Sequence, residues 1–392
     1  MNTIVLVAFC LGVSLLFSEI FRKFKYPRVM GQIIAGVILG IPVIKVLFTA
    51  ENLGDIGFLS ELGIVFLLFL VGLEVNLRKL KKSSRDALLI AVFGAVIPFA
   101  FGFILMKAMG YSNIVASVLG ACLALTAEGS KLAVLIEMKV LNTKLGAIML
   151  GAGILDDIFE VLFLALLLIY IKKSQFYLHL VPLSIIGFLL LAFIALRLIP
   201  KLLKKMQREK SKISVLSTII VIGFGAAAVS QVMGFGAVIG AFIGGAFIQW
   251  VTKGKSDGRL GIDKLKVLTF ALIIPFFFIN IGLHFDIMSV IKEPMLLLLV
   301  LIVAVAGKMI GSIIVTPMTD LSLKQTTLIG WGMNSRGAIE LVLAEIARVN
   351  NLIPIEIYSV VIAMAVITTL MFPFALKHYL KKYPNIMGDR TD

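Results

Sequence analysis

Charge is scarce in this sequence. Of the 392 residues only 15% are charged, whereas 60% are hydrophobic, and the mean hydropathy is +1.07. Soluble domains contain about 25% charged and about 45–50% apolar residues. The composition therefore excludes a water-soluble globule and a disordered chain alike.

Cysteine is nearly absent as well. Cys10 and Cys122 both lie inside apolar runs, which excludes a disulfide framework and a zinc cluster. The polar stretches between apolar runs are short, so no large soluble module is predicted. The sequence offers no nucleophile–base arrangement and no phosphate-binding loop, so we expect neither an enzyme nor a bound cofactor.

Long apolar runs dominate instead. A helix needs roughly 20 apolar residues to cross a hydrocarbon core of about 30 Å, and this criterion yields about 13 spans. They lie near residues 2–21, 29–47, 56–74, 87–109, 113–137, 145–171, 178–200, 213–233, 235–251, 264–284, 294–317, 325–348 and 354–376. The predicted fold class is an all-α membrane protein.

Most of the 37 Lys and Arg residues lie in the connections after odd-numbered spans and in the C-terminal tail. Positively charged connections stay on the cytoplasmic side of a membrane. We therefore expect a multi-pass protein of the plasma membrane with its N-terminus outside and its C-terminus in the cytoplasm. The net charge of +15 thus reports topology, and nucleic acid is not an expected partner.

Two short phrases recur seven spans apart. Residues 69–77 and 279–287 share the order apolar-Gly-Leu-polar-apolar-Asn/Asp-apolar, and residues 31–36 have a looser echo at 236–241. Because seven is odd, equivalent spans would cross the bilayer in opposite directions, as in the inverted repeats of secondary transporters. We predict two inverted six-helix repeats joined by a linker helix at 176–212.

Ionisable side chains lie deep in four of the predicted spans. Asp156 and Asp157 in the sixth span and Lys308 in the eleventh lie roughly 15 Å from the cytoplasmic side, at 1.5 Å per residue. Glu128 in the fifth span and Arg336 in the twelfth lie at a similar depth. Such groups cost several kcal/mol unless they are paired or hydrated, so their common depth predicts a functional site.

The fifth and twelfth spans are also interrupted by glycine and small polar residues. The interruptions comprise Thr126, Glu128, Gly129 and Ser130 in one span, and Asn334, Ser335, Arg336 and Gly337 in the other. Unwound backbone is tolerated at membrane depth only inside protein or beside water. We therefore predict two crossed broken helices around the acidic residues.

Adjacent carboxylates in a poorly hydrated site cannot both ionise cheaply. Protons can neutralise Asp156 and Asp157, and so can a hard cation coordinated through oxygen; competition between the two would couple their gradients. Thr126, Ser130 and unwound carbonyls could complete the oxygen shell. Glu160 shares the helix face of the doublet, either as a third site carboxylate or as a charge facing the outer vestibule.

Structural interpretations of these residues stay open. The two aspartates could stabilise helix contacts, and Lys308 could be a purely structural counter-ion. Arg336 either acts in transport or holds its broken span against Glu340 or Glu128. Lys131 is assigned a structural pairing with Glu128 or Glu137.

With Asp156 and Asp157 in the sixth span, Lys308 in the eleventh and Ser335-Arg336-Gly337 in the twelfth, the chain resembles the cation:proton antiporter superfamily. It is most similar to the prokaryotic electrogenic sodium/proton antiporters. Supporting phrases lie at residues 26–36, 61–74, 240–245 and 276–282. The resemblance implies a homodimer with a scaffold (1–86 and 213–293), an elevator-like moving core (87–175 and 294–380) and a cytoplasmic tail (381–392).

The resemblance also assigns roles by position. Asp157 corresponds to the main carrier of the cation and the proton, Asp156 to the partner of Lys308, and Thr126 to the threonine of the first broken helix. The paired-aspartate form implies electrogenic exchange of Na+ or Li+ for protons. The ion selectivity and the ion stoichiometry stay open, because the chain departs from the family pattern at five positions. These positions are Glu128, Lys131, Glu160, Ala338 and Glu340.

Two alternatives accompany this prediction. Exchange of K+ for protons would use the same architecture, and Glu128 and Glu160 would permit it. A passive channel or a non-transporting membrane scaffold is the alternative from another functional class. The charged residues at one depth count against a scaffold, and occluding broken helices count against an open pore.

Overall fold

The structure is a computed structural model that describes residues 2–24, 26–74, 84–127, 131, 135, 140, 143–172, 212–232, 236–252, 256–383 and 386–387. Within these ranges all regular secondary structure elements are helices, as the composition predicts. Six helices of the described part are long and apolar enough to cross a membrane. They are Thr3–Lys23, Ala50–Glu74, Arg85–Ala108, Ile262–Leu283, Pro294–Met318 and Ile355–Lys382.

Several predicted spans are built from shorter helices. Apolar helices of 10–17 residues cover Arg28–Leu39, Asn113–Ala124, Leu216–Val232 and Ala237–Gln249. The span predicted at 325–348 consists of two helices, and the one predicted at 178–200 lies outside the described residues. The structure thus supports an all-helical membrane protein, whereas helix length alone does not establish the predicted number of spans.

The chain forms two compact units, to each of which both halves of the sequence contribute. The first contains Met1–Phe17, Gln32–Leu77 and Leu164–Leu283, and the second contains Ser18–Gly31, Arg78–Phe163 and His284–Asp392. The helices α1 (Thr3–Lys23), α2 (Arg28–Leu39) and α9 (Lys144–Lys172) contain residues of both units.

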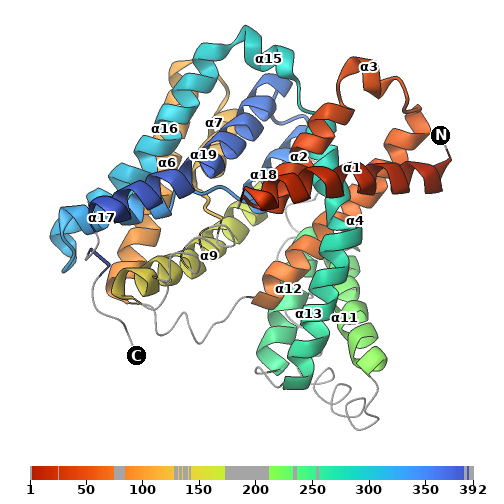
Figure 1. Ribbon diagram of the computed structural model, residues 1–392, viewed down its shortest axis with the longest axis horizontal. Coiled ribbons are helices and arrows are strands. Elements are labelled where there is room, and N and C mark those ends of the chain that lie inside the picture. Colours follow the sequence, from red (N-terminus) through yellow and green to blue (C-terminus); the bar gives the residue numbers. More distant parts are fainter. Residues whose placement is uncertain are drawn as a thin grey trace. The chain divides into compact units, whose positions relative to one another are not determined.

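The remaining helices of the first unit are α3 (Pro42–Lys45), α4 (Ala50–Glu74), α11 (Lys212–Val232), α12 (Ala237–Thr252), α13 (Ser256–Leu272) and α14 (Ile274–Leu283). α4 packs against α12 and α14, and α12 packs against α11 (Figure 1). The break between α13 and α14 divides the predicted tenth span. It precedes Pro275, which lacks an amide hydrogen for the helical ladder.

Two close helix contacts in the first unit match one another. Gly36 on α2 lies against the backbone of Gly282 on α14, and Gly245 on α12 lies against the backbone of Gly72 on α4. A Cβ atom at any of these positions would overlap the backbone of the neighbouring helix. Glycine therefore permits the close packing that replaces hydrophobic driving force between helices in a membrane.

The second unit contains α6 (Arg85–Ala108), α7 (Asn113–Ala124), α15 (Ile287–Lys292), α16 (Pro294–Ile313), α17 (Leu323–Gly332), α18 (Ala338–Val349) and α19 (Ile355–Lys382), with a 3-10 turn at Thr316–Met318. The hydroxyls of Ser84, Ser112 and Ser322 accept hydrogen bonds from amides in the first turns of α6, α7 and α17. Such caps pair amides that the helix itself leaves free.

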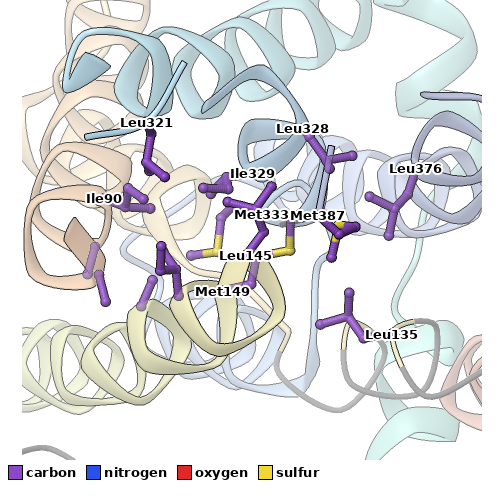
Figure 2. Close-up of a cluster of buried hydrophobic side chains, with 14 of the residues drawn as sticks. Ile90, Leu135, Leu145, Met149, Leu321, Leu328, Ile329, Met333, Leu376 and Met387 are labelled. Carbon is purple, nitrogen blue, oxygen red and sulfur yellow. The ribbon is translucent and has the colours of Figure 1, made fainter. Parts of the chain in front are cut away.

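An apolar core packs four of the helices in this unit together (Figure 2). α6, α9, α17 and α19 all contribute buried side chains, among them Ile90, Met149, Ile329 and Leu376. α16 packs along α6 because Gly307 and Gly311 have no side chain where Pro98 and the backbone of Phe93 approach. The second unit thus has a packed interior in which the charged residues of the predicted site are held.

Candidate functional site

Two unwound segments meet inside the second unit. α7 ends at Ala124 and is followed by the non-helical residues 125–127. The interruption predicted in the other span is present, because α17 ends at Gly332 and α18 begins at Ala338. The amide of Ala127 donates to the carbonyl of Ser335, and the hydroxyl of Ser335 donates to the carbonyl of Ala127, each at 2.9 Å. The two segments therefore satisfy each other's backbone groups, which a membrane interior would otherwise leave unpaired.

Two buried cations cover the C-terminal end of α7. The guanidinium of Arg336 donates to the carbonyls of Leu123, at 2.7 Å, and Leu125. The ammonium of Lys308 donates to the carbonyl of Ala124. The last carbonyls of a helix lack intrahelical partners and mark the negative end of its dipole, which favours cations there. Backbone carbonyls, together with the nearby carboxylates, thus hold these charges inside the protein.

Lys308 also pairs with the first aspartate of the doublet. Its Nζ lies 3.5 Å from Oδ2 of Asp156 and donates to the hydroxyl of Thr126 at 2.6 Å. Both charged side chains are at most 1% exposed. Neither carboxylate oxygen of Asp156 has a hydrogen-bond partner among the described residues. Asp157, the next residue on α9, is half-buried.

Two glutamates add further negative charge. Oε1 of Glu160, one turn after Asp157 on α9, accepts the amide hydrogen of Thr126 at 3.3 Å. Oε1 of Glu340 accepts the amide hydrogen of Gly337 at 2.6 Å, while its Oε2 has no hydrogen-bond partner in the described part of the chain. Glu160 interacts electrostatically with the doublet and with Glu340. The structure thus gathers Glu160 and Glu340, which the sequence left as accessory candidates, around the unwound segments.

The remaining predicted residues have mixed outcomes. Asn334 donates from Nδ2 to the carbonyl of Gly330 at 2.9 Å and so extends the end of α17. Lys131 donates to the carbonyl of Met149 at 3.0 Å and contacts the sulfur of Met333 at 3.4 Å. Four predicted site or pairing residues lie outside the described residues: Glu128, Gly129, Ser130 and Glu137.

Thr369 on α19 is a site residue that the sequence did not single out. Its Oγ1 accepts from the amide of Arg336 at 3.1 Å and donates to the carbonyl of Arg336 at 3.0 Å. This clamp fixes the backbone beside the buried guanidinium. A hydroxyl inside an apolar span is the one signal that could have indicated Thr369, and it is a common feature of membrane helices.

The arrangement has the chemistry of a site for a small hard cation or for protons. Carboxylate, hydroxyl and carbonyl oxygens converge near Asp156, Thr126 and the end of α7, and such oxygens are the ligands that hard cations prefer. These oxygens can bind a cation or a proton and release it again without any other covalent bond being formed or broken. The site is thus suited to binding and release.

Known proteins share both the sequence and the fold of this chain. The family described as "Sodium/hydrogen exchanger, transmembrane" matches residues 6–382. The Na(+)/H(+) antiporter of Enterococcus hirae is 31% identical over 383 residues, which cover 97% of each chain. The Na(+)/H(+)-K(+) antiporter GerN of Bacillus cereus is 26% identical over 373 residues, or 95% of each chain. The sodium proton antiporter MjNhaP1 of Methanocaldococcus jannaschii, solved at pH 8, shares the fold, with a TM-score of 0.70 and 16% identity over 99% of both chains.

Proposed function

Because this chain belongs to the sodium/hydrogen exchanger family of membrane transporters, we propose that it exchanges cytoplasmic Na+ or Li+ for external protons. The observation that carries the proposal is the buried pair of Asp156 and Lys308 beside two unwound, mutually bonded helix segments. We assign the transported cation and the proton to Asp157 and Asp156, with Thr126 and Ser130 as further oxygen ligands. The relatives that this chain matches are named for transport rather than for catalysis.

The proposed exchange is a competition for one set of oxygens. The ammonium of Lys308 now bonds the Ala124 carbonyl and the Thr126 hydroxyl and pairs with Asp156. An alkali ion at the doublet would take over such oxygens and displace a proton from Asp157, and the lysine would lose its partner. Returning protons would restore the pair. No covalent bond other than that of the proton forms or breaks.

Electrogenic exchange follows from the lysine in this account. If Lys308 gives up its own proton whenever a cation binds, in addition to the proton displaced from Asp157, more charge returns as protons than leaves as Na+. The exchange rate would then depend on membrane potential. A neutral residue at position 308 would remove that dependence.

We further propose an elevator mechanism in a homodimer, with two inverted repeats. All described site residues lie in the second unit, which would be the moving core, and the first unit would be the dimer scaffold. The repeat is supported by the matching contacts, because Gly36 meets Gly282 as Gly245 meets Gly72. The helix of Gly36 corresponds to that of Gly245, and the helix of Gly72 to that of Gly282, so the proposed repeat relates one contact to the other.

The location and orientation follow from charge. Lys and Arg gather in the connections after odd-numbered spans and in the tail. The positive-inside rule then places the N-terminus outside and the C-terminus in the cytoplasm. We propose that the protein resides in the plasma membrane, where cytoplasmic Na+ can leave the cell.

Exchange of K+ for protons is the second candidate. It is supported by the relative named for Na+, H+ and K+ and by the additional carboxylate of Glu160, which lies near the doublet. A larger or more weakly hydrated ion would need a different oxygen shell, for which Glu128 is the further carboxylate that the sequence offers.

An ion-swap assay tests the proposal. The purified chain is reconstituted into liposomes with an internal pH dye, and Na+, Li+ or K+ is added outside at equal osmolarity. We expect Na+ and Li+ to drive proton movement and K+ to do so weakly. A passive channel would instead carry current without coupled proton flux, and a non-transporting scaffold would give neither signal.

A further inference from the structure

A column of polar side chains follows the interface between α16 and α17. On α16 it consists of Lys308 and Ser312, and it continues to Thr316 in the turn after the helix. On α17 and the segment that follows, it consists of Thr326 and Asn334. Because residues four apart lie on the same face of a helix, each set forms one row of side chains.

The two rows lie opposite one another in antiparallel register. Oγ1 of Thr316 lies 2.8 Å from Oγ1 of Thr326 in a hydrogen bond. Four residues further along each helix, Cβ of Ser312 lies next to the position where Gly330 lacks a side chain. One turn before Ser312 on α16 is Lys308, and Asn334 lies just beyond the end of α17. The column therefore leads from the α16–α17 turn to the lysine of the site, about 12 Å at 1.5 Å per residue.

Two oxygens in the column have no hydrogen-bond partner. Oγ of Ser312 and Oδ1 of Asn334 are buried and unpaired among the residues that the structure describes, and the two residues are 0% and 2% exposed. Buried polar groups in proteins are almost always paired, with protein atoms or with ordered water. Other buried hydroxyls of this unit donate to a carbonyl of their own helix, as Thr368 does to Met364 at 2.8 Å, so the unpaired hydroxyl of Ser312 is an exception.

We propose that this column is the path along which protons move between the cytoplasm and Lys308, separate from the path of the cation. The inference rests on the proposed exchange function and on its orientation. When cytoplasmic Na+ binds, the proton that Lys308 gives up passes through water to Ser312, and each hydroxyl or bridging water of the column accepts one proton while it donates another. The proton leaves to cytoplasmic water at Thr316, and the neutral amine of Lys308 later accepts a proton from the outside and pairs with Asp156 again. Only O–H and N–H bonds form and break, and one proton reaches the cytoplasm for each proton that Lys308 releases.

Two modes of transport in liposomes test this path with the full-length protein. Na+/H+ exchange requires protons to reach the site, whereas exchange of radioactive Na+ for unlabelled Na+ at equal pH requires only the cation. The variants are Ser312→Ala and Thr326→Val, which remove one hydroxyl each and nearly preserve side-chain volume. Thr368→Val is the matched control, because it removes a buried hydroxyl of the same unit that bonds only its own helix.

We expect both column variants to slow Na+/H+ exchange roughly tenfold, because positioned proton-transfer groups contribute a factor of about 10²–10⁴ and water replaces a lost hydroxyl in part. Their Na+/Na+ exchange should match that of Thr368→Val. Equal slowing of both transport modes would show that the column residues only pack the helices, and it would overturn the proposal. Unchanged Na+/H+ exchange in both variants would overturn it as well. Wild-type protein that exchanges labelled Na+ without moving protons would instead overturn the proposed antiport.

Discussion

The ammonium of Lys308 lies 2.6 Å from the hydroxyl oxygen of Thr126. The same ammonium bonds the carbonyl of Ala124 and faces Asp156. A built-in cation therefore occupies oxygens that a transported cation would need. Under the proposed exchange the transported cation would compete with Lys308 for these oxygens, so each of these residues can be tested separately.

Replacing Asp157 with Asn should abolish exchange. An amide cannot release a proton or supply a charged ligand, so neither ion would be carried. The measurement is pH-driven Na+ uptake in proteoliposomes. The matched control is Asp286→Asn at the start of α15, where Asp286 accepts from the amide of Met288 at 3.0 Å and an asparagine can still cap the helix. Sustained uptake by the Asp157 variant would refute the assignment.

Replacing Lys308 with Gln should remove the voltage response and destabilise the protein. Loss of one partner from a buried ion pair leaves an uncompensated charge and costs about 3–5 kcal/mol. The Tm in detergent should therefore fall, and it should recover in part when Asp156→Asn is combined with Lys308→Gln. An unaltered dependence of the exchange rate on membrane potential would contradict the role proposed for this lysine.

Replacing Gly337 with Ala should force the two unwound segments apart. A Cβ atom at this position would lie 2.8 Å from Cβ of Ala127 and 3.0 Å from its Cα. Overpacking of this kind costs about 1–3 kcal/mol, so Tm and exchange rate should both fall. Gly94→Ala in α6 is the matched control, because its Cβ would meet no atom within 4 Å. Equal behaviour of the two variants would show that the crossing tolerates separation.

Acid should weaken the apparent affinity for Na+ without lowering the maximal rate. Cation binding to carboxylates displaces protons. The KM for Na+ should therefore rise by about tenfold for each unit by which the pH is lowered, in the pH range in which Asp157 is protonated. Initial rates at several pH values and Na+ concentrations measure this. A maximal rate that falls with pH at constant KM would indicate that protons act elsewhere than at the cation site.

The positions of the charged site residues could largely be predicted from the sequence. Asp156 and Lys308 were expected near one another because they lie at a similar depth in their spans, and an ionisable residue in a membrane is costly unless it is paired. The interruptions around Ser335 were also predictable, since glycine and small polar residues rarely share an apolar helix. These signals depend on residue type, which the sequence records directly.

The partners of these residues could not be predicted in the same way. The carbonyls of Leu123 and Leu125 hold Arg336, and every residue has a carbonyl, so only the end of α7 in space reveals which ones are free. Thr369 lies on a helix distant in sequence, and its clamp depends on the packing of α19. Span boundaries differed where Pro275 and the unwound segments divide apolar runs that hydropathy reads as continuous.

Proton release on Na+ binding tests the central claim most directly. Purified protein in weakly buffered detergent solution is titrated with NaCl while a dye reports free protons, with Asp157→Asn and choline chloride as controls. Competition at the doublet predicts at least one proton released for each Na+ bound by the wild type, and none in either control. Saturable Na+ binding by the wild type without proton release would contradict the account.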